Sequence, residues 1–356
     1  QIPNIHYNYT QLYRFLIKNL RISYFYHYLI LYIMYLLKNI FLKFEENINT
    51  LIADLGATNA RLAIVNDFKD IINKSTYKIK NFKNLDDLLN NYINEFDIPR
   101  KKLSGVLGVA APIIGNDISF VNIDFSFSKK DIESHFFPKG LRVLNDVQMQ
   151  GYAINNFPRE KLISIGKNNN LIQGQKILIV PGTGLGMSIL NNGKCIATEA
   201  GHLNIPTLNK KIKKLLDSFE KEFERAATFE DLLSGKGVSY IYSTLSQNID
   251  HPHSNEDILK NITNDEFCIE TKNCLIEIYA YFAKYAALIT GSIGGVYLSG
   301  SLSESLIEDR DFLKFKKIFE KSAKMNKYLS SIPIFLIREA DLGFIGALEV
   351  CKNEFL

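Results

Sequence analysis

A candidate strand at residues 50–53 runs directly into the segment Asp54-Leu-Gly-Ala-Thr-Asn-Ala-Arg61. A carboxylate, a glycine, a hydroxyl, an amide and a guanidinium therefore follow one another closely. In such a turn, backbone N–H groups and the Thr58 hydroxyl can surround phosphate oxygens while Asp54 faces a Mg²⁺ ion. Gly56 suits the turn because it has no Cβ. The alternative is a plain β-hairpin in which Asp54 and Gly56 serve only the turn.

A second glycine loop, Gly182-Thr-Gly-Leu-Gly186, follows the apolar run 176–180. Its alternating glycines let peptide N–H groups turn inward onto an anion, and Thr183 adds a hydroxyl donor. The spacing does not match G-x-G-x-x-G, which argues against a dinucleotide-binding Rossmann unit. Taken alone, the loop is equally consistent with a structural hairpin. Two such loops on separate strands could each bind phosphate groups of one nucleotide.

The pair Asn145-Asp146 closes the apolar run 141–144, just before a candidate helix. Ligands of open α/β sheets bind at the carboxyl ends of the strands, which is where this pair is expected. Asp146 is therefore a candidate general base that takes a proton from a sugar hydroxyl as it attacks a γ-phosphate. The alternative is a routine helix cap.

Side chains suited to reading hydroxyl groups occur in three further places. Glu199 and His202 share one short turn with Gly201 between them, Glu230 begins a candidate helix, and Asn122 is a further amide. Carboxylates, imidazoles and amides pair with the donors and acceptors of a sugar. Each also has an ordinary structural alternative, such as a helix-start charge for Glu230. A metal site on Glu199 and His202 lacks a third ligand at a convincing spacing.

From Asn47 onward, short apolar runs alternate with amphipathic stretches, which is typical of an α/β protein. We expect strands over residues 51–54, 61–65, 105–110, 141–144, 176–180, 187–190, 295–299 and 332–337. We expect helices over residues 84–94, 129–136, 147–155, 210–225, 267–290 and 342–351. No repeat of 20–50 residues is apparent in the sequence.

Length and composition narrow the class of protein. A chain of 356 residues is long for a single core, so two domains or lobes are expected. The net charge of +4 is slight, and Lys and Arg are scattered among acidic residues, which disfavours nucleic-acid binding. The cysteines show no C-x-x-C pair, so we expect thiols in a reducing compartment rather than a zinc site. They are Cys195, Cys268, Cys274 and Cys351.

Residues 1–46 differ from everything that follows. Arg14, Lys18 and Arg21 precede the apolar run 24–37, an arrangement similar to a signal anchor. The run is shorter than the roughly 20 residues that span a bilayer, and it lacks a small-residue cleavage site. Four readings stay open: an extension without a role, such as an over-long reading frame, a membrane anchor, an organelle-targeting segment, or an extra packed helix.

Taken in order, these segments resemble the bacterial-type glucokinases of the hexokinase/actin-like ATPase superfamily, from about Asn47 to the C-terminus. The segments that carry the resemblance are Asp54-Leu-Gly-Ala-Thr-Asn-Ala-Arg61, Ala111-Pro-Ile-Ile-Gly115, Asn145-Asp146, Gly182-Thr-Gly-Leu-Gly186, Glu199-Ala-Gly-His202, Glu230-Asp-Leu-Leu-Ser-Gly235, Gly294-Gly-Val-Tyr-Leu-Ser-Gly300 and Asp341-Leu-Gly-Phe-Ile-Gly346. The neighbouring ROK proteins follow a similar carboxylate-Gly-His segment with a cysteine-rich zinc motif, which is absent after His202.

The resemblance implies phosphorylation of glucose at its 6-hydroxyl by ATP and Mg²⁺, with Asp146 as the catalytic base. The implied glucose ligands are Asn122, Asn145, Asp146, Glu199, His202 and Glu230. The implied ATP and phosphate contacts are Ala53, Asp54, Leu55, Gly56, Ala57, Thr58, Asn59, Arg61, Gly182, Thr183, Gly184 and Gly300, with Asp54 holding Mg²⁺ through water. A kinase for another hexose, or a non-catalytic sugar-sensing regulator of the same fold, are the alternatives.

The resemblance also implies a two-lobed α/β actin-like ATPase (ribonuclease H-like) fold with a cleft between the lobes. Residues 47–156 with 338–356 would form a small domain, and 157–337 a large one. We expect a cytoplasmic homodimer, with membrane contact or organelle targeting only through residues 1–46. Two positions depart from the usual family pattern, because Ser301 and Ala200 stand where glycines are common. These departures put the affinity for nucleotide or sugar in question.

Overall fold

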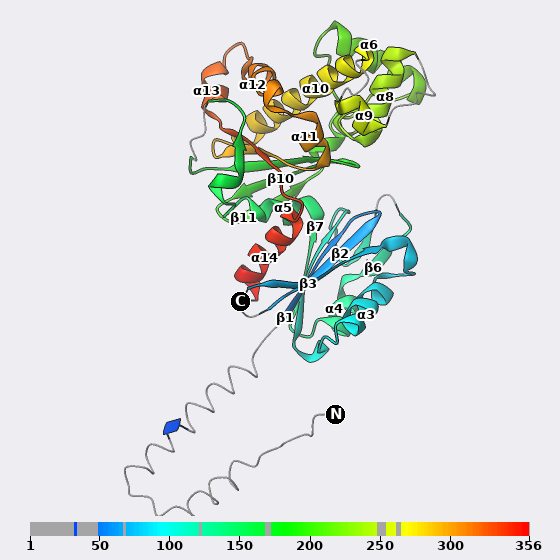
Figure 1. Cartoon of the computed structure of the whole chain (residues 1–356), viewed down its shortest axis with the longest axis vertical. Coiled ribbons are helices and arrows are strands. Elements are labelled where there is room, and N and C mark those ends of the chain that lie inside the picture. The colour runs from blue at the N-terminus through cyan, green and yellow to red at the C-terminus, as the bar shows by residue number, and fades with distance from the viewer. Residues whose placement is uncertain are drawn as a thin grey trace, which may run out of the picture. The chain divides into compact units, whose positions relative to one another are not determined.

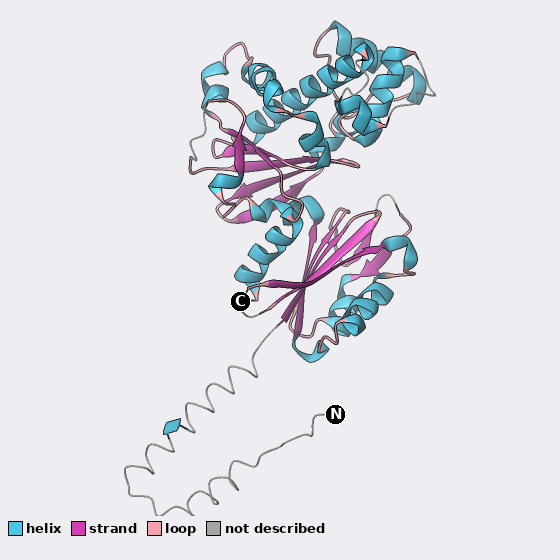
Figure 2. Cartoon of the chain, in the orientation of Figure 1, coloured by secondary structure: helices cyan, strands magenta, loops and turns pink. Residues whose placement is uncertain are grey.

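The computed structural model describes residues 32–33, 49–66, 69–120, 123–167, 172–247, 254–260 and 265–355. The chain divides into two units at residues 48 and 49, and the architecture below is that of the second unit (Figures 1 and 2). The interpretations of residues 1–46 fall almost entirely outside the described residues. Within the described residues, no helix has both the length and the apolar character needed to cross a bilayer.

The first sheet contains five strands in the order β3-β2-β1-β4-β7. They are β1 (Asn49–Leu55), β2 (Asn59–Val65), β3 (Ile71–Lys78), β4 (Leu103–Val109) and β7 (Leu141–Asn145). The three strands β1, β4 and β7 run parallel, whereas β2 and β3 are added as antiparallel hairpin strands. Every residue of β4 is buried, as expected for a parallel strand covered on both faces.

The second sheet repeats this strand order and adds one edge strand, giving β11-β10-β9-β12-β13-β8. The strands are β8 (Leu162–Ser164), β9 (Lys176–Pro181), β10 (Leu185–Asn191), β11 (Lys194–Thr198), β12 (Gly295–Leu298) and β13 (Ile334–Ile337). Here β9, β12 and β13 are parallel, and β10 and β11 form the antiparallel hairpins. The β1–β2 and β9–β10 turns therefore hold corresponding places in two sheets built alike.

Helices cover the sheets, and a two-stranded ribbon extends the first part of the chain. The helices are α3 (Leu85–Glu95), α4 (Lys129–Phe136), α5 (Asp146–Ala153), α6 (Lys210–Phe223), α7 (Phe229–Leu232), α8 (Gly235–Ser246), α9 (Asn255–Lys260), α10 (Glu266–Thr290), α11 (Ser301–Leu306), α12 (Phe312–Glu320), α13 (Asn326–Ser331) and α14 (Leu342–Glu354). The ribbon pairs β5 (Asp117–Ser119) with β6 (Ser126–Ser128). Short 3-10 turns occur at Ile79–Asn81, Arg100–Lys102, Arg159–Lys161, Ala200–His202 and Asp309–Asp311.

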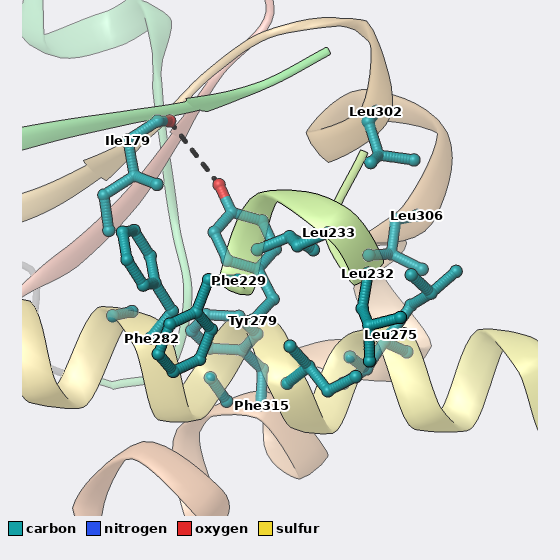
Figure 3. Packing of buried hydrophobic residues seen from close by; sticks show 14 of the residues in the cluster. Ile179, Phe229, Leu232, Leu233, Leu275, Tyr279, Phe282, Leu302, Leu306 and Phe315 are labelled. Carbon is teal, nitrogen blue, oxygen red and sulfur yellow. Dashed lines mark hydrogen bonds between the residues drawn. The ribbon is translucent and has the colours of Figure 1, made fainter. Parts of the chain in front are cut away.

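The largest apolar cluster lies between α10 and the second sheet. Figure 3 shows Tyr279 and Phe282 of α10 packed with Phe229 of α7 and Phe315 of α12. The buried Tyr279 hydroxyl lies 2.8 Å from Ser303 Oγ and 3.5 Å from the Ile179 carbonyl oxygen. Its polar atom is therefore paired inside an otherwise apolar core.

Helices α5 and α14 follow the last parallel strands of the two sheets and pack against each other (Figure 1). A Cβ atom at Gly346 would lie 1.9 Å from the Met149 carbonyl oxygen, so only glycine permits this approach. Although α14 follows the second sheet, Phe344 and Val350 belong to a cluster with Ile52 of the first. The expected domain limits stay a prediction.

Every strand and helix expected from the sequence is present, with ends displaced by a few residues, and the helix over 129–136 has the expected limits. The elements that were not expected include β3 and α8. Strand β3 alternates half-buried and exposed residues at the sheet edge, so it carries no long apolar run. Helix α8 contains glycine, serine and threonine, which are weak helix formers.

Candidate active site

Asp54 and Arg61 face each other across the first hairpin. They are direct partners in the antiparallel register of β1 and β2, and Arg61 Nη2 contacts Asp54 Oδ2. Arg61 Nη1 also donates to the Ala340 carbonyl oxygen at 2.7 Å, and Arg61 Cζ lies 5.5 Å from the centre of the Phe344 ring. The Asp54 carboxylate is therefore held by a guanidinium that is itself anchored at the start of α14. The predicted phosphate contact of Arg61 stays a prediction.

The turn between β1 and β2 presents its polar atoms to solvent. Gly56 N–H donates to the Asn59 carbonyl oxygen at 3.0 Å, which closes the turn. Thr58 and Asn59 are exposed at the tip and Ala57 is half-buried. The side chains of Ala53 and Leu55, by contrast, are buried within β1, so only their backbones are available for a nucleotide.

The turn between β9 and β10 is hydrogen-bonded to residues of helices α7 and α8. Gly182 N–H donates to the Gly184 carbonyl oxygen at 2.8 Å, and Gly235 N–H donates to the Gly182 carbonyl oxygen at 2.9 Å. Glu230 Oε2 accepts the Leu185 N–H at 2.8 Å. A Cβ atom at Gly184 would lie only 2.6 Å from that carboxylate oxygen. The loop predicted to bind phosphate and the Glu230 predicted to bind sugar are thus neighbours, and Thr183 is exposed beside them.

The N-cap of helix α5 is Asn145, whereas the structural alternative had assigned the cap to the Asp146 carboxylate. Its Oδ1 accepts the N–H groups of Val147 and Gln148 at 3.1 and 3.0 Å, and its Nδ2 lies 3.4 Å from the Ala111 carbonyl oxygen. Asp146, the first residue of α5, accepts the Val147 N–H through Oδ1 at 2.8 Å. Asn145 and Asp146 thus lie together at the carboxyl end of β7 and the start of α5.

The Asp146 carboxyl group lies within electrostatic reach of two other carboxylates, Asp54 and Glu199. Burial, and to a smaller extent the negative charges of Asp54 and Glu199, raise the pKa of Asp146 to about 7, while the hydrogen bond from Val147 N–H works in the opposite direction. Accumulated negative charge of this kind marks functional sites more often than structural ones. A carboxyl group that titrates near neutral pH is suited to exchanging protons with a substrate.

Glu199 and His202 lie on one turn, as expected, with Glu199 Oε2 and His202 Nε2 3.8 Å apart and both side chains more than half exposed. Gly201 between them is buried, and a Cβ atom there would lie 2.2 Å from the Leu185 carbonyl oxygen. The backbone of Leu185 therefore contacts both groups: its carbonyl oxygen faces Gly201, and its N–H donates to Glu230. The remaining predicted sugar ligand, Asn122, lies outside the described residues.

Gly300 is the N-cap of α11 and has a φ of +93°, a conformation that favours glycine. A Cβ atom there would lie 2.8 Å from the Pro181 carbonyl oxygen, so this position must approach the β9 loop closely. The neighbouring Ser301 is exposed. Ala200, the second departure from the family pattern, packs against the core cluster of the second sheet.

The carboxylates Asp54 and Asp146 fit a divalent cation. Oxygen ligands suit Mg²⁺, and a cation here would relieve the repulsion that raises the pKa of Asp146. Mg²⁺ commonly keeps several waters and uses one or two carboxylates together with substrate phosphates. The described part of the chain contains no group of three or more His, Cys, Asp and Glu residues that would hold a metal on its own, and its four cysteines are buried.

The anchoring of Arg61 on α14 was not found from the sequence. Ala340 and Phe344 lie more than two hundred positions away along the chain, and Lys74 Nζ pairs with Asp341 Oδ2 at 2.6 Å in the same cluster. The motif Asp341-Leu-Gly-Phe-Ile-Gly346 was recognised, but its contact partner was not. In the structure, a Cβ atom at Gly343 would lie 2.9 Å from Asp54 Oδ2, so this glycine of the motif allows α14 to approach Asp54 closely.

Solved structures share this fold. The glucokinase from an Antarctic psychrotroph superimposes with a TM-score of 0.71 at 23% identity, covering 86% of this chain and 99% of its own. The glucokinase of Balamuthia mandrillaris in complex with glucose gives 0.72 at 19% identity, over 86% and 94%. A ROK family transcriptional regulator gives 0.62 at 12%. The predicted fold class is confirmed: this is the actin-like ATPase fold of the sugar kinases.

Sequence comparison then gives the family. The family model described as Glucokinase matches residues 51–354, and the chain belongs to this family. Glucokinase of Colwellia psychrerythraea is 27% identical over 325 residues, covering 87% of this chain and 98% of its own. Glucokinase of Campylobacter jejuni subsp. doylei is 28% identical over 315 residues, covering 85% and 94%. The resemblance seen in the ordered motifs is confirmed.

Proposed function

We propose that this chain transfers the γ-phosphoryl group of ATP to the 6-hydroxyl of glucose. The observation that carries the proposal is the Asp146 carboxyl group, whose pKa is raised to about 7 beside Asp54 and Glu199. It begins α5 in a chain that belongs to the glucokinase family. A kinase needs a base at the acceptor hydroxyl and charge neutralisation at the phosphates, and this site offers both.

Asp146 accepts the proton of the sugar hydroxyl. The bond from the sugar oxygen to the γ-phosphorus forms, the bond from that phosphorus to the β,γ-bridging oxygen breaks, and ADP leaves. Since a base is most effective when its pKa lies near the working pH, a value of about 7 suits this step. The Val147 N–H, which donates to Oδ1 at 2.8 Å, keeps the carboxyl group oriented.

Glucose would be read by Glu199, His202 and Glu230, with Asn145 and Asn122 as further ligands. The packing around Leu185 supports this assignment, because Glu230 accepts the Leu185 N–H and Gly201, between Glu199 and His202, lies against the Leu185 carbonyl oxygen. Carboxylates and an imidazole accept and donate hydrogen bonds to neutral hydroxyl groups without needing a charged ligand.

ATP would lie along the two glycine turns, Gly56–Thr58 and Gly182–Gly184, with Gly300 near the adenosine. The exposed hydroxyls of Thr58 and Thr183 support this assignment. Asp54 would hold Mg²⁺ through water, and Mg²⁺ supplies neutralisation of the phosphate charge. Arg61 keeps the Asp54 carboxylate in place through its contact with Oδ2.

We also propose that residues 47–156 and 338–356 form a small domain and residues 157–337 a large one. The proposal includes a cytoplasmic location and a homodimer. The regulator alternative is not favoured, because Asp146 and both glycine turns are present together with the family match. Another hexose as preferred substrate has no observation in its favour.

The function is tested by ATP-dependent sugar phosphorylation in the presence of Mg²⁺. We expect glucose 6-phosphate to form with the unmodified chain and Asp146→Asn to lose nearly all turnover. Competition among glucose, mannose and glucosamine identifies the preferred hexose. Glucose binding without any turnover would instead support the sensing regulator.

A further inference from the structure

A second cavity lies at the end of the second sheet remote from the glycine turns. Its volume is about 330 Å³, near the lower limit for small-molecule sites. Strand β9 begins at this cavity with Lys176 and ends at Pro181, directly before the Gly182 turn. Helix α5 likewise begins with Asp146, whereas Ile154 at its C-terminal cap lines the cavity. The cavity is therefore separate from the site described above.

The cavity contains a lysine without a counter-charge. Lys176 is half-buried, and burial lowers its pKa. Its Nζ donates to the Ile154 carbonyl oxygen at 3.1 Å and lies 5.8 Å from the centre of the Tyr297 ring. No carboxylate of the described residues forms an ion pair with it. An ammonium group has three donors, so two remain beyond the bond to Ile154.

The remaining walls combine neutral amides with apolar surface. Asn155, Gln173 and Asn192 supply the amides, while the half-buried Leu162 and the exposed Ile172 supply apolar surface. A single cation among neutral groups matches one negative charge, and the apolar walls match a hydrocarbon body.

We propose that this cavity is a second ligand site, which binds a small organic monocarboxylate with an apolar body through Lys176. The carboxylate accepts the two remaining ammonium hydrogens, and the hydrocarbon body packs against Leu162 and Ile172. The bound carboxylate pairs with the Lys176 ammonium group and so offsets the loss of solvation that lowers its pKa. The ligand does not enter the catalytic site, so saturating glucose and ATP leave its affinity unchanged.

The test measures binding of phenylacetate to the full chain at pH 7.5 by calorimetry and ligand-observed NMR. Phenylacetamide, which has the same shape without the charge, is the matched ligand. We expect saturable binding of phenylacetate that is at least tenfold tighter than that of the amide. Equal affinity for the two ligands, or no saturable binding of phenylacetate, would overturn the proposal, and this test needs no variant of the protein.

A pair of variants locates the site. Lys176→Met keeps the length of the side chain without its charge, and we expect it to weaken phenylacetate binding at least tenfold. Lys139→Met, at an exposed lysine outside the cavity, should leave binding unchanged. If Lys176→Met binds as tightly as the unmodified chain, or if glucose displaces phenylacetate, the assignment to this cavity is wrong. Either result leaves the proposed kinase activity untouched.

Discussion

Replacing Asp146 by asparagine should stabilise the protein while removing its activity. Burial and the charges of Asp54 and Glu199 raise the pKa of Asp146 from 3.8 to about 7. The folded state therefore holds this proton more tightly than the unfolded state, and the protein loses stability as the pH rises between these two values. Asparagine has no charge to lose, and its Oδ1 can still accept the Val147 N–H.

The size of the effect follows from the shift. Each pKa unit corresponds to about 1.4 kcal/mol, so a shift of about three units sets a ceiling of roughly 4 kcal/mol. Because Asp146 is partly exposed to solvent and the site can relax, we expect a gain of about 1–3 kcal/mol at pH 8. The gain should shrink steadily below pH 7 and nearly vanish at pH 4.

The assay is urea unfolding between pH 5 and 8.5 without Mg²⁺ or nucleotide, followed by circular dichroism. Asp117→Asn, on the exposed part of strand β5, is the matched control and should show no comparable dependence on pH. A difference in unfolding free energy between Asp146→Asn and the unmodified chain that does not vary with pH would refute the electrostatic argument. So would a loss of stability at pH 8.

Two further predictions concern the groups around Asp146. Arg61→Met should weaken Mg²⁺-dependent ATP binding about tenfold and lower the unfolding free energy by about 1.5–3 kcal/mol, because Asp54 loses a charge-assisted hydrogen bond. Unchanged Mg²⁺ titrations with ATP would contradict this role. Gly184→Ala should raise the KM for glucose several-fold, since its Cβ would lie 2.6 Å from Glu230 Oε2, whereas Gly182→Ala enters open space and should leave that KM unchanged. Equal glucose KM values for the two variants would argue against Glu230 as a sugar ligand.

The sheets could be predicted from the sequence wherever strands are buried on both faces. Strands β4 and β9 are long apolar runs bounded by turn residues, and both were expected. The edge strand β3 was not, because half its positions face solvent and its sequence is polar. Helix α12 was not expected, although its sequence has the amphipathic pattern of a helix.

The position of the candidate site at one edge of the first sheet followed from topology as well as sequence. Asp54 and Asn145 lie at the carboxyl ends of parallel strands of one sheet. Strand direction alone therefore predicts that both residues lie at the same edge of that sheet. Glu199 follows a strand of the second sheet, and its residue type suggested sugar binding, but no local pattern indicated that it would act electrostatically on Asp146. The contact of Arg61 with Ala340 depends on how α14 packs on the first sheet, which no local pattern encodes.

The most direct test of the central claim is the rate of glucose 6-phosphate formation by the full chain with ATP and Mg²⁺, measured beside Asp146→Asn. The account predicts ATP-dependent product with the unmodified chain. It also predicts a loss of at least a hundredfold in turnover for the variant, within the range for removing a general base. Turnover of Asp146→Asn close to that of the unmodified chain would contradict the account, because the site would then lack its base.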